Sequence, residues 1–151
     1  LQWMRCSLGQ TWQGGTCVGE AKTYSWQAAL DAADTLNRQG GYAGYQDWRV
    51  PTKEELLALV YCSSGQPKTW NDTGALCGGN YGSPTLNQSA FPNTPNRWYW
   101  SSSSVRFQPH DPALIVDFDG GDVKANDKKM HYNYVRLVRC GSCAADSDFV
   151  F

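Results

Sequence analysis

Six cysteines constrain the fold of this chain more than any other feature, because they fall into three pairs that are close in sequence. We predict three disulfides that each close a short loop around a glycine-containing turn: Cys6–Cys17, Cys62–Cys77 and Cys140–Cys143. Two alternatives stay open for the last pair. One alternative is half of a zinc site, although such a site would need further ligands. The other is a redox Cys-x-x-Cys motif, although such a motif normally opens a helix. Disulfides predict a mature chain that works outside the reducing cytosol.

Length and composition narrow the class of protein. The chain has 151 residues, which predicts one domain over residues 1–151, and its 7 Trp, 8 Tyr and 5 Phe can supply a core. A net charge of −1 argues against a nucleic-acid partner or a membrane-surface protein. The longest apolar run, residues 56–62, is far shorter than the roughly 18 residues of a membrane span, so we predict no membrane insertion by this segment. Because the chain begins at Leu1 without Met, we expect that an upstream segment has been removed.

Two helices are expected in the first half of the chain. Over residues 24–37 the apolar side chains recur at helical spacing, with Ser25 or Thr23 as the N-cap and glycines at the end. The second helix begins with a capping box, in which Thr52 and Glu55 satisfy each other's backbone donors, and continues to Cys62.

The rest of the chain is expected to form strands and one long loop. Residues 1–6 favour an edge strand and residues 9–17 a hairpin. The segment 63–96 is rich in Gly, Pro, Asn and Ser and predicts a structured loop that Cys62–Cys77 pins. Later strands are predicted at residues 97–101, 113–118, 122–125 and 134–139. In the last strand we expect one buried face and one that carries Arg136 and Arg139. Helices followed by strands predict an α+β fold.

Six short motifs occur in a fixed order along the chain. They are Asp-Trp-Arg-Val-Pro-Thr at 47–52, Glu-Leu-Leu at 55–57, Phe-Pro at 91–92, Tyr-Trp-Ser-Ser at 99–102, Val-Asp-Phe-Asp-Gly-Gly-Asp-Val at 116–123 and Tyr-Val-Arg-Leu-Val-Arg at 134–139. In this order they resemble the C-terminal domain of the Legionella collagen-like protein and its relatives. The resemblance spans nearly all of residues 1–139, and the segment 140–151 with its Cys-Gly-Ser-Cys is an extra C-terminal tail.

The resemblance implies a C-type lectin-like fold, in which two helices pack on a twisted, mostly antiparallel sheet with long loops. It also implies a secreted or surface-displayed bacterial adhesion domain that binds a ligand rather than an enzyme.

One stretch has the composition of a recognition face, because aromatic, amide and basic side chains are concentrated between residues 98 and 133. We predict that this face binds an extracellular glycan, for example a sulfated or acidic polysaccharide, or a protein. The candidate ligand-binding residues are Trp98, Tyr99, Arg106, Phe107, Gln108, His110, Asp119, Asp122, Lys124, Asn126, Asp127, Lys128, Lys129, His131, Tyr132 and Asn133. A modest basic cluster consists of Lys124, Lys128, Lys129, His131 and Arg136.

Three other functions fit the sequence less well. No cofactor is expected, and calcium is the weaker alternative: Asp117, Asp119, Asp122 and Asp127 miss the EF-hand spacing, and Trp70-Asn71-Asp72 lies in a loop rather than in the late strand of sugar-binding lectins. An enzyme is not expected, because neither a nucleophile motif nor a zinc-binding His pair is present; an enzyme similar to formylglycine-generating proteins would need two free cysteines. A structural head of a pilin-like or fibre subunit, which binds copies of itself, is the remaining alternative.

Overall fold

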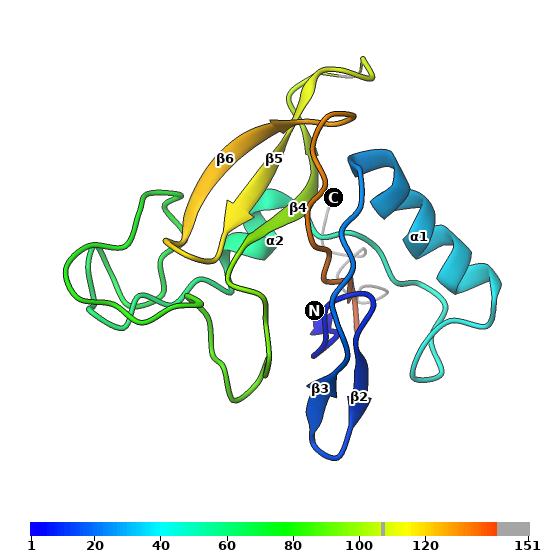
Figure 1. The fold of residues 1–151 in the computed structure, drawn as a ribbon, viewed down its shortest axis with the longest axis horizontal. Coiled ribbons are helices and arrows are strands. Elements are labelled where there is room, and N and C mark those ends of the chain that lie inside the picture. The colour runs from blue at the N-terminus through cyan, green and yellow to red at the C-terminus, as the bar shows by residue number, and fades with distance from the viewer. Residues whose placement is uncertain (107, 142–151) are drawn as a thin grey trace, which may run out of the picture.

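The structure is a computed structural model that describes residues 1–106 and 108–141. It has the predicted α+β composition, with two helices and three small antiparallel sheets (Figure 1). The largest sheet has the order β4 (Trp98–Ser104), β5 (Pro112–Asp117) and β6 (Asp122–Asp127). In Figure 1 the longer helix lies to the right of this sheet, and the shorter one overlaps the lower ends of β4 and β5. Neither described helix has the length and apolar character that a membrane crossing requires.

The first helix is confirmed. Helix α1 covers Trp26–Arg38, and the Ser25 side chain caps it by accepting the Ala28 N–H at 3.4 Å. Its Ala29 and Ala33 are buried in the core. The helix is tied to the main sheet because the Trp26 indole donates to the Ser101 carbonyl at 2.9 Å.

The second helix is shorter than predicted. Helix α2 covers only Lys53–Leu57, although the predicted capping box of Thr52 and Glu55 is present. After it the backbone tightens into i to i−3 hydrogen bonds, with Val60 N–H donating to the Leu57 carbonyl at 3.0 Å. From Tyr61 onward the chain pairs with the long loop instead, which ends the helix before Cys62.

The main sheet confirms three predicted strands, of which two are longer than predicted and the middle one is shifted by one residue. Strand β4 covers Trp98–Ser104, β5 Pro112–Asp117 and β6 Asp122–Asp127, all antiparallel. The β5–β6 turn requires glycine at Gly121: its φ is 83°, and a Cβ there would lie 2.7 Å from Val60 Cγ1.

The chain ends form two smaller sheets. Strand β1 (Gln2–Trp3) pairs with β7 (Val138–Arg139), and β2 (Thr11–Gln13) forms a hairpin with β3 (Thr16–Val18). The predicted strand 134–139 is therefore mostly wrong as a regular strand. Its first part runs alongside β4 instead, where Tyr134 N–H donates to the Trp98 carbonyl and the Tyr134 carbonyl accepts from Trp100 N–H.

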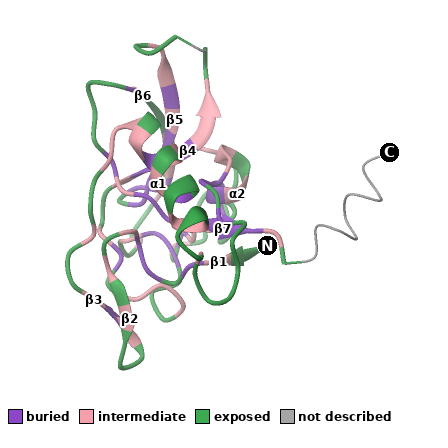
Figure 2. Cartoon of the chain, turned by 90° about the vertical axis from the view of Figure 1, so that its right-hand side faces the viewer, coloured by how far each residue is buried: buried purple, intermediate pink, exposed green. Residues whose placement is uncertain are grey.

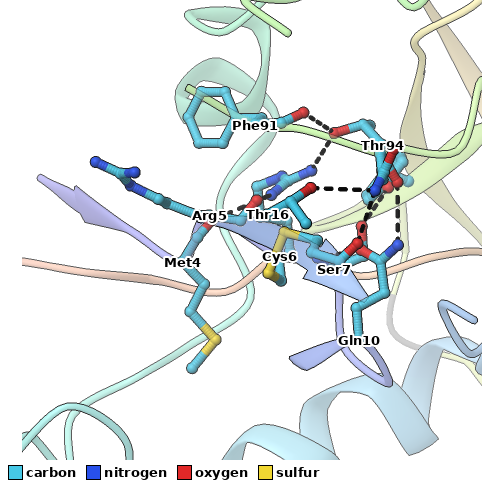
Figure 3. The surroundings of a disulfide bond; sticks show 12 residues. Met4, Arg5, Cys6, Ser7, Gln10, Thr16, Phe91 and Thr94 are labelled. Carbon is cyan, nitrogen blue, oxygen red and sulfur yellow. Dashed lines mark hydrogen bonds between the residues drawn. A yellow bond between two sulfur atoms is a disulfide. The ribbon is translucent and has the colours of Figure 1, made fainter. Parts of the chain in front are cut away.

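The predicted division into a buried face and a face that carries Arg136 and Arg139 is wrong, because both arginines are buried. Arg136 is 1% exposed, and its guanidinium donates to the carbonyls of Met4 and Arg5 and, at 2.7 Å, to Thr94 Oγ1. Figure 3 shows these three acceptor residues next to Cys6, with the Thr94 hydroxyl donating to the Phe91 carbonyl. Two backbone carbonyls and the Thr94 hydroxyl thus hold the buried cation inside the fold.

Arg139 also lies against the protein rather than in solvent. It is 8% exposed, its Nε donates to Asp47 at 2.7 Å, and its guanidinium stacks over the Tyr45 ring. The hydrogen bond from Arg139 lowers the pKa of the Asp47 carboxyl. Period-two alternation does not distinguish a solvent-facing strand residue from one covered by a distant loop.

Two hydrophobic clusters make up the core. One gathers around α1, Trp48 and Trp100, and the other around α2, Tyr99 and Phe118, so the main sheet buries residues on both faces. In Figure 2 the buried segments concentrate on β5 and on β7 near the N-terminus.

Two predicted disulfides are confirmed, Cys6–Cys17 and Cys62–Cys77. Cys140 is also disulfide-bonded, and its predicted partner Cys143 lies outside the described residues. The long loop 63–96 contains no helix or strand, yet it is pinned as predicted: besides the disulfide, Cys77 N–H donates to the Gly120 carbonyl and Thr85 N–H to the Phe118 carbonyl.

Candidate binding surface

The predicted face divides into an interior part and an accessible part. Tyr99, Asn126, Lys128 and Asn133 are buried, and Phe107 lies outside the described residues. Tyr99 belongs to the core and its hydroxyl bonds the Ser7 hydroxyl, while burial raises its pKa. The remaining residues are exposed or half-buried: Trp98, Arg106, Gln108, His110, Asp119, Asp122, Lys124, Asp127, Lys129, His131 and Tyr132.

The accessible residues fall into three neighbourhoods. At the β4–β5 connection, His110 lies 3.6 Å from Asp127, whose carboxylate also accepts the N–H groups of Lys129 and Met130. Those backbone hydrogen bonds lower the pKa of Asp127. Asp119 and Asp122 lie at the β5–β6 turn. The third neighbourhood is a hollow beside Trp98.

The Trp98 hollow has a volume of about 350 Å³ and brings together parts of the chain that are distant in sequence. In Figure 1 the segment between β6 and β7 runs down beside β4 there. Its described lining residues are Thr23, Arg97, Trp98, His131, Tyr132, Asn133 and Tyr134. Four of these belong to the predicted face.

The Trp98 hollow contains an exposed aromatic ring and an amide group that lacks a hydrogen-bond partner among the described residues. Tyr132 is 65% exposed, whereas Asn133 is 4% exposed and its Nδ2 is buried without a hydrogen-bond partner among the described residues. The backbone of Asn133 is fixed by two 2.9 Å hydrogen bonds with Tyr24. A buried amide donor without a partner is costly, which makes it a candidate to bind a ligand or water.

The two cations nearest to this hollow differ in whether they are already paired with an acidic side chain. Arg97 is exposed and forms no ion pair within residues 1–106 and 108–141. Lys124 lies over the Trp98 ring at 5.2 Å but is paired with Asp117 at 2.7 Å, and that hydrogen bond raises its pKa. Arg97 is therefore the cation that is most available to an acidic ligand.

Only part of the predicted basic cluster is accessible to solvent in the folded chain. Arg136 is enclosed, and the Lys128 ammonium donates to the Arg106 carbonyl and lies 4.5 Å from the Trp26 ring centroid. Only Lys124, Lys129 and His131 of that cluster reach the surface. A strong, extended polyanion-binding field is not formed by these residues.

A second hollow was missed by the sequence reasoning. The Trp70 hollow measures about 400 Å³ and lies on the long loop. Its described lining residues are Tyr61, Ser63, Trp70, Gly82, Pro84, Leu86, Asn87, Gln88 and Ser89. The sequence signal for this hollow is a tryptophan within a polar loop, Trp70, which the calcium alternative also includes.

An aromatic groove lies at the N-terminal end of the fold. The groove has a volume of about 350 Å³. It is lined by five aromatic residues, Trp3, Trp12, Tyr42, Tyr45 and Trp48, together with Gln2, Met4, Arg5 and Ala43. Arg5 stacks over Trp12 and Arg139 over Tyr45, so the protein's own cations already cover two of these rings.

The side chains considered for calcium are placed by the structure as follows. Residues 1–106 and 108–141 hold no group of three His, Cys, Asp or Glu side chains that could bind a metal ion. Asn71 is fully buried, donating to the Ala75 carbonyl and accepting from Thr73, and Asp72 pairs with Lys68 at 2.5 Å. Asn71 and Asp72 are thus engaged by protein groups.

Comparison with known families gives the identity that the resemblance suggested. The chain belongs to the Lcl C-terminal domain family, whose model matches residues 1–139. Comparison with curated proteins gave no match. Family membership is consistent with a domain displayed at a bacterial surface, and the disulfides indicate a compartment outside the reducing cytosol.

Proposed function

We propose that this domain is a non-enzymatic extracellular adhesion module with a C-type lectin-like fold, and that it binds an acidic glycan in the Trp98 hollow. The observation that carries the proposal is the convergence of the unpaired Arg97 cation, the exposed Tyr132 ring and the unpartnered Asn133 amide. Aromatic surface with a few polar groups of fixed position is the usual composition of a small-ligand site.

Each group has a distinct role in this proposal. The Arg97 guanidinium pairs with a carboxylate or sulfate of the glycan, because its planar donors match such anions. The rings of Tyr132 and Trp98 pack against the apolar face of a sugar ring. The Asn133 amide donates to a sugar hydroxyl and gains its missing partner.

The absence of catalysis is part of the same proposal. Two carboxylates that could serve in acid–base catalysis are already in ion pairs, Glu55 with Arg49 and Asp117 with Lys124. Within the described residues no cysteine is free, which argues against the chemistry of formylglycine-generating proteins. A fibre-subunit head remains the alternative function, and it predicts reversible association of copies in sedimentation experiments.

A glycan array with neutral, carboxylated and sulfated members tests the proposed function, followed by calorimetry on Arg97→Gln. We expect salt-sensitive binding of acidic glycans and a loss of about tenfold in affinity, or about 1.4 kcal/mol, for Arg97→Gln. Arg38→Gln is the matched control, because it removes an exposed arginine at the end of α1, outside the hollow. Equal losses in both variants would show diffuse charge attraction, and unchanged affinity in Arg97→Gln would place the site elsewhere.

A further inference from the structure

We propose that the Trp70 hollow is a second binding site and that its ligand class is neutral sugars. This inference goes beyond the acidic-glycan site, because it concerns a hollow with a different lining and a ligand of different charge. It rests on four observations: an exposed ring, uncommitted polar groups, the absence of charge in the described lining, and a pinned loop.

Trp70 offers a stacking surface that the fold leaves open. The residue is 54% exposed, although tryptophan normally contributes to cores. A T-shaped contact with Tyr61, with ring centroids 5.0 Å apart, orients the indole, and an isolated bridge joins the two backbones. The apolar C–H face of a pyranose ring packs on such a surface.

Polar side chains in the hollow provide both donors and acceptors. Asn87 Oδ1 accepts the N–H groups of Ser89 and Ala90 at 3.0 and 3.1 Å, which leaves its NH₂ for a ligand. Ser63 Oγ accepts the Gly82 N–H at 2.7 Å and keeps its hydroxyl proton. The side chains of Gln88 and Ser89 form no hydrogen bond to other described residues. Sugar hydroxyls, which donate and accept, match this combination.

The described lining contains no charged side chain, and this determines the ligand class. The nearest charges in sequence, Lys68 and Asp72, neutralise each other in an ion pair. An anionic ligand would lose hydration in this hollow without gaining a cation, whereas a neutral sugar exchanges water for amide and hydroxyl partners. The hollow thus differs in selectivity from the one that contains Arg97.

The loop that bears the hollow is held in position before any ligand arrives. The Cys62–Cys77 disulfide closes it, Cys62 N–H donates to the Thr69 carbonyl, and Tyr61 N–H donates to the Thr85 carbonyl. Leu86 is 3% exposed and anchors the polar segment that follows it to the core. A pinned loop loses less conformational entropy on binding, which favours affinity from a small contact area.

Calorimetric titration with three neutral oligosaccharides, maltotetraose, cellotetraose and chitotetraose, tests this proposal on the disulfide-intact chain. We expect at least one to bind in the micromolar to millimolar range, and Trp70→Ala to weaken it by about tenfold or more. Tyr42→Ala is the matched control, because it removes an exposed ring that lies outside both hollows. Trp70→Phe should also remove the sugar-induced change in tryptophan fluorescence.

A second variant and a measurement of acidic-glycan binding complete the test. If Trp70→Ala does not fold, Gln88→Ala replaces it, since that side chain is exposed and uncommitted, and we expect about threefold weaker binding. Acidic-glycan binding should persist in Trp70→Ala, so failure of the proposed function and failure of this site are distinguishable. The proposal is overturned if no oligosaccharide binds at millimolar concentration, or if the variants of Trp70 and Gln88 bind as the wild type does.

Discussion

The Trp98 hollow and the Trp70 hollow both present an exposed ring beside amide side chains, but the chain supports them by different means. The first is bordered by β4 and by residues 131–134, which strand-like hydrogen bonds and the buried Arg136 hold in place. The second lies on a loop without helix or strand, closed by Cys62–Cys77. Surface hollows can thus be positioned either by a sheet or by a cross-linked loop, and each support can be removed separately.

The largest effect is expected from Arg136→Met, which removes the support of the Trp98 hollow. Three acceptors would lose their buried donor, so we expect a loss of about 4 kcal/mol in the free energy of unfolding, measured by urea denaturation. Arg38→Met, at an exposed position, should change it by less than about 0.5 kcal/mol. A loss below about 1 kcal/mol for Arg136→Met would show that its hydrogen bonds do not hold the segment.

Removal of the Cys62–Cys77 disulfide tests the other support. The two cysteines are 15 residues apart, so replacing both by Ala should cost about 3 kcal/mol through the freed entropy of the unfolded loop. Amide exchange in residues 63–90 should accelerate and the Trp70 hollow should lose its ligand.

The Cys6–Cys17 pair provides the matched comparison, because its separation of 11 residues predicts a similar loss of stability. That double variant should retain neutral-sugar binding under conditions where it remains folded. If both double variants affect the Trp70 hollow equally, the disulfides act on the whole fold rather than on the loop.

The smallest expected effect is the loss of stability at acidic pH, and it should leave both hollows unchanged. The pKa of Glu55 is lowered to about 2, chiefly by its hydrogen bond with Arg49 and further by the Thr52 N–H, against the opposing effect of burial. Because the folded pKa lies below the unfolded value of 4.5, this stabilisation is complete above pH 4.5 and is lost as the pH falls towards about 2.

Unfolding free energies of the wild type and Glu55→Gln, measured across that range, should converge at low pH. The difference at neutral pH should be on the order of 1 kcal/mol, because Arg49 is partly exposed and solvent screens the pair. Glu54→Gln is the control at a neighbouring, exposed carboxylate. Curves that stay parallel down to the acid limit would contradict the role of Glu55.

Sequence reasoning succeeded where neighbours along the chain decide the outcome. The Ser25 cap, the Thr52–Glu55 capping box, the β5–β6 turn and the two confirmed disulfides all depend on groups within about fifteen residues of each other. It also found four residues of the Trp98 hollow, because aromatic and amide side chains are concentrated in that part of the sequence. The early end of α2 was missed because the Tyr61 N–H pairs with the carbonyl of Thr85, in a later part of the long loop.

The sequence by itself determined the first helix, the helix caps, the strands of the main sheet, the disulfide pairing near the N-terminus and in the long loop, and the family. Only the tertiary structure decided which polar side chains are accessible. Arg136 and Lys128 are as polar as Arg97 and Lys129, yet the first two are enclosed by acceptors from distant segments while the last two reach solvent. Burial of a cation depends on which carbonyls and rings surround it after folding, and those partners lie up to 132 residues away in the chain.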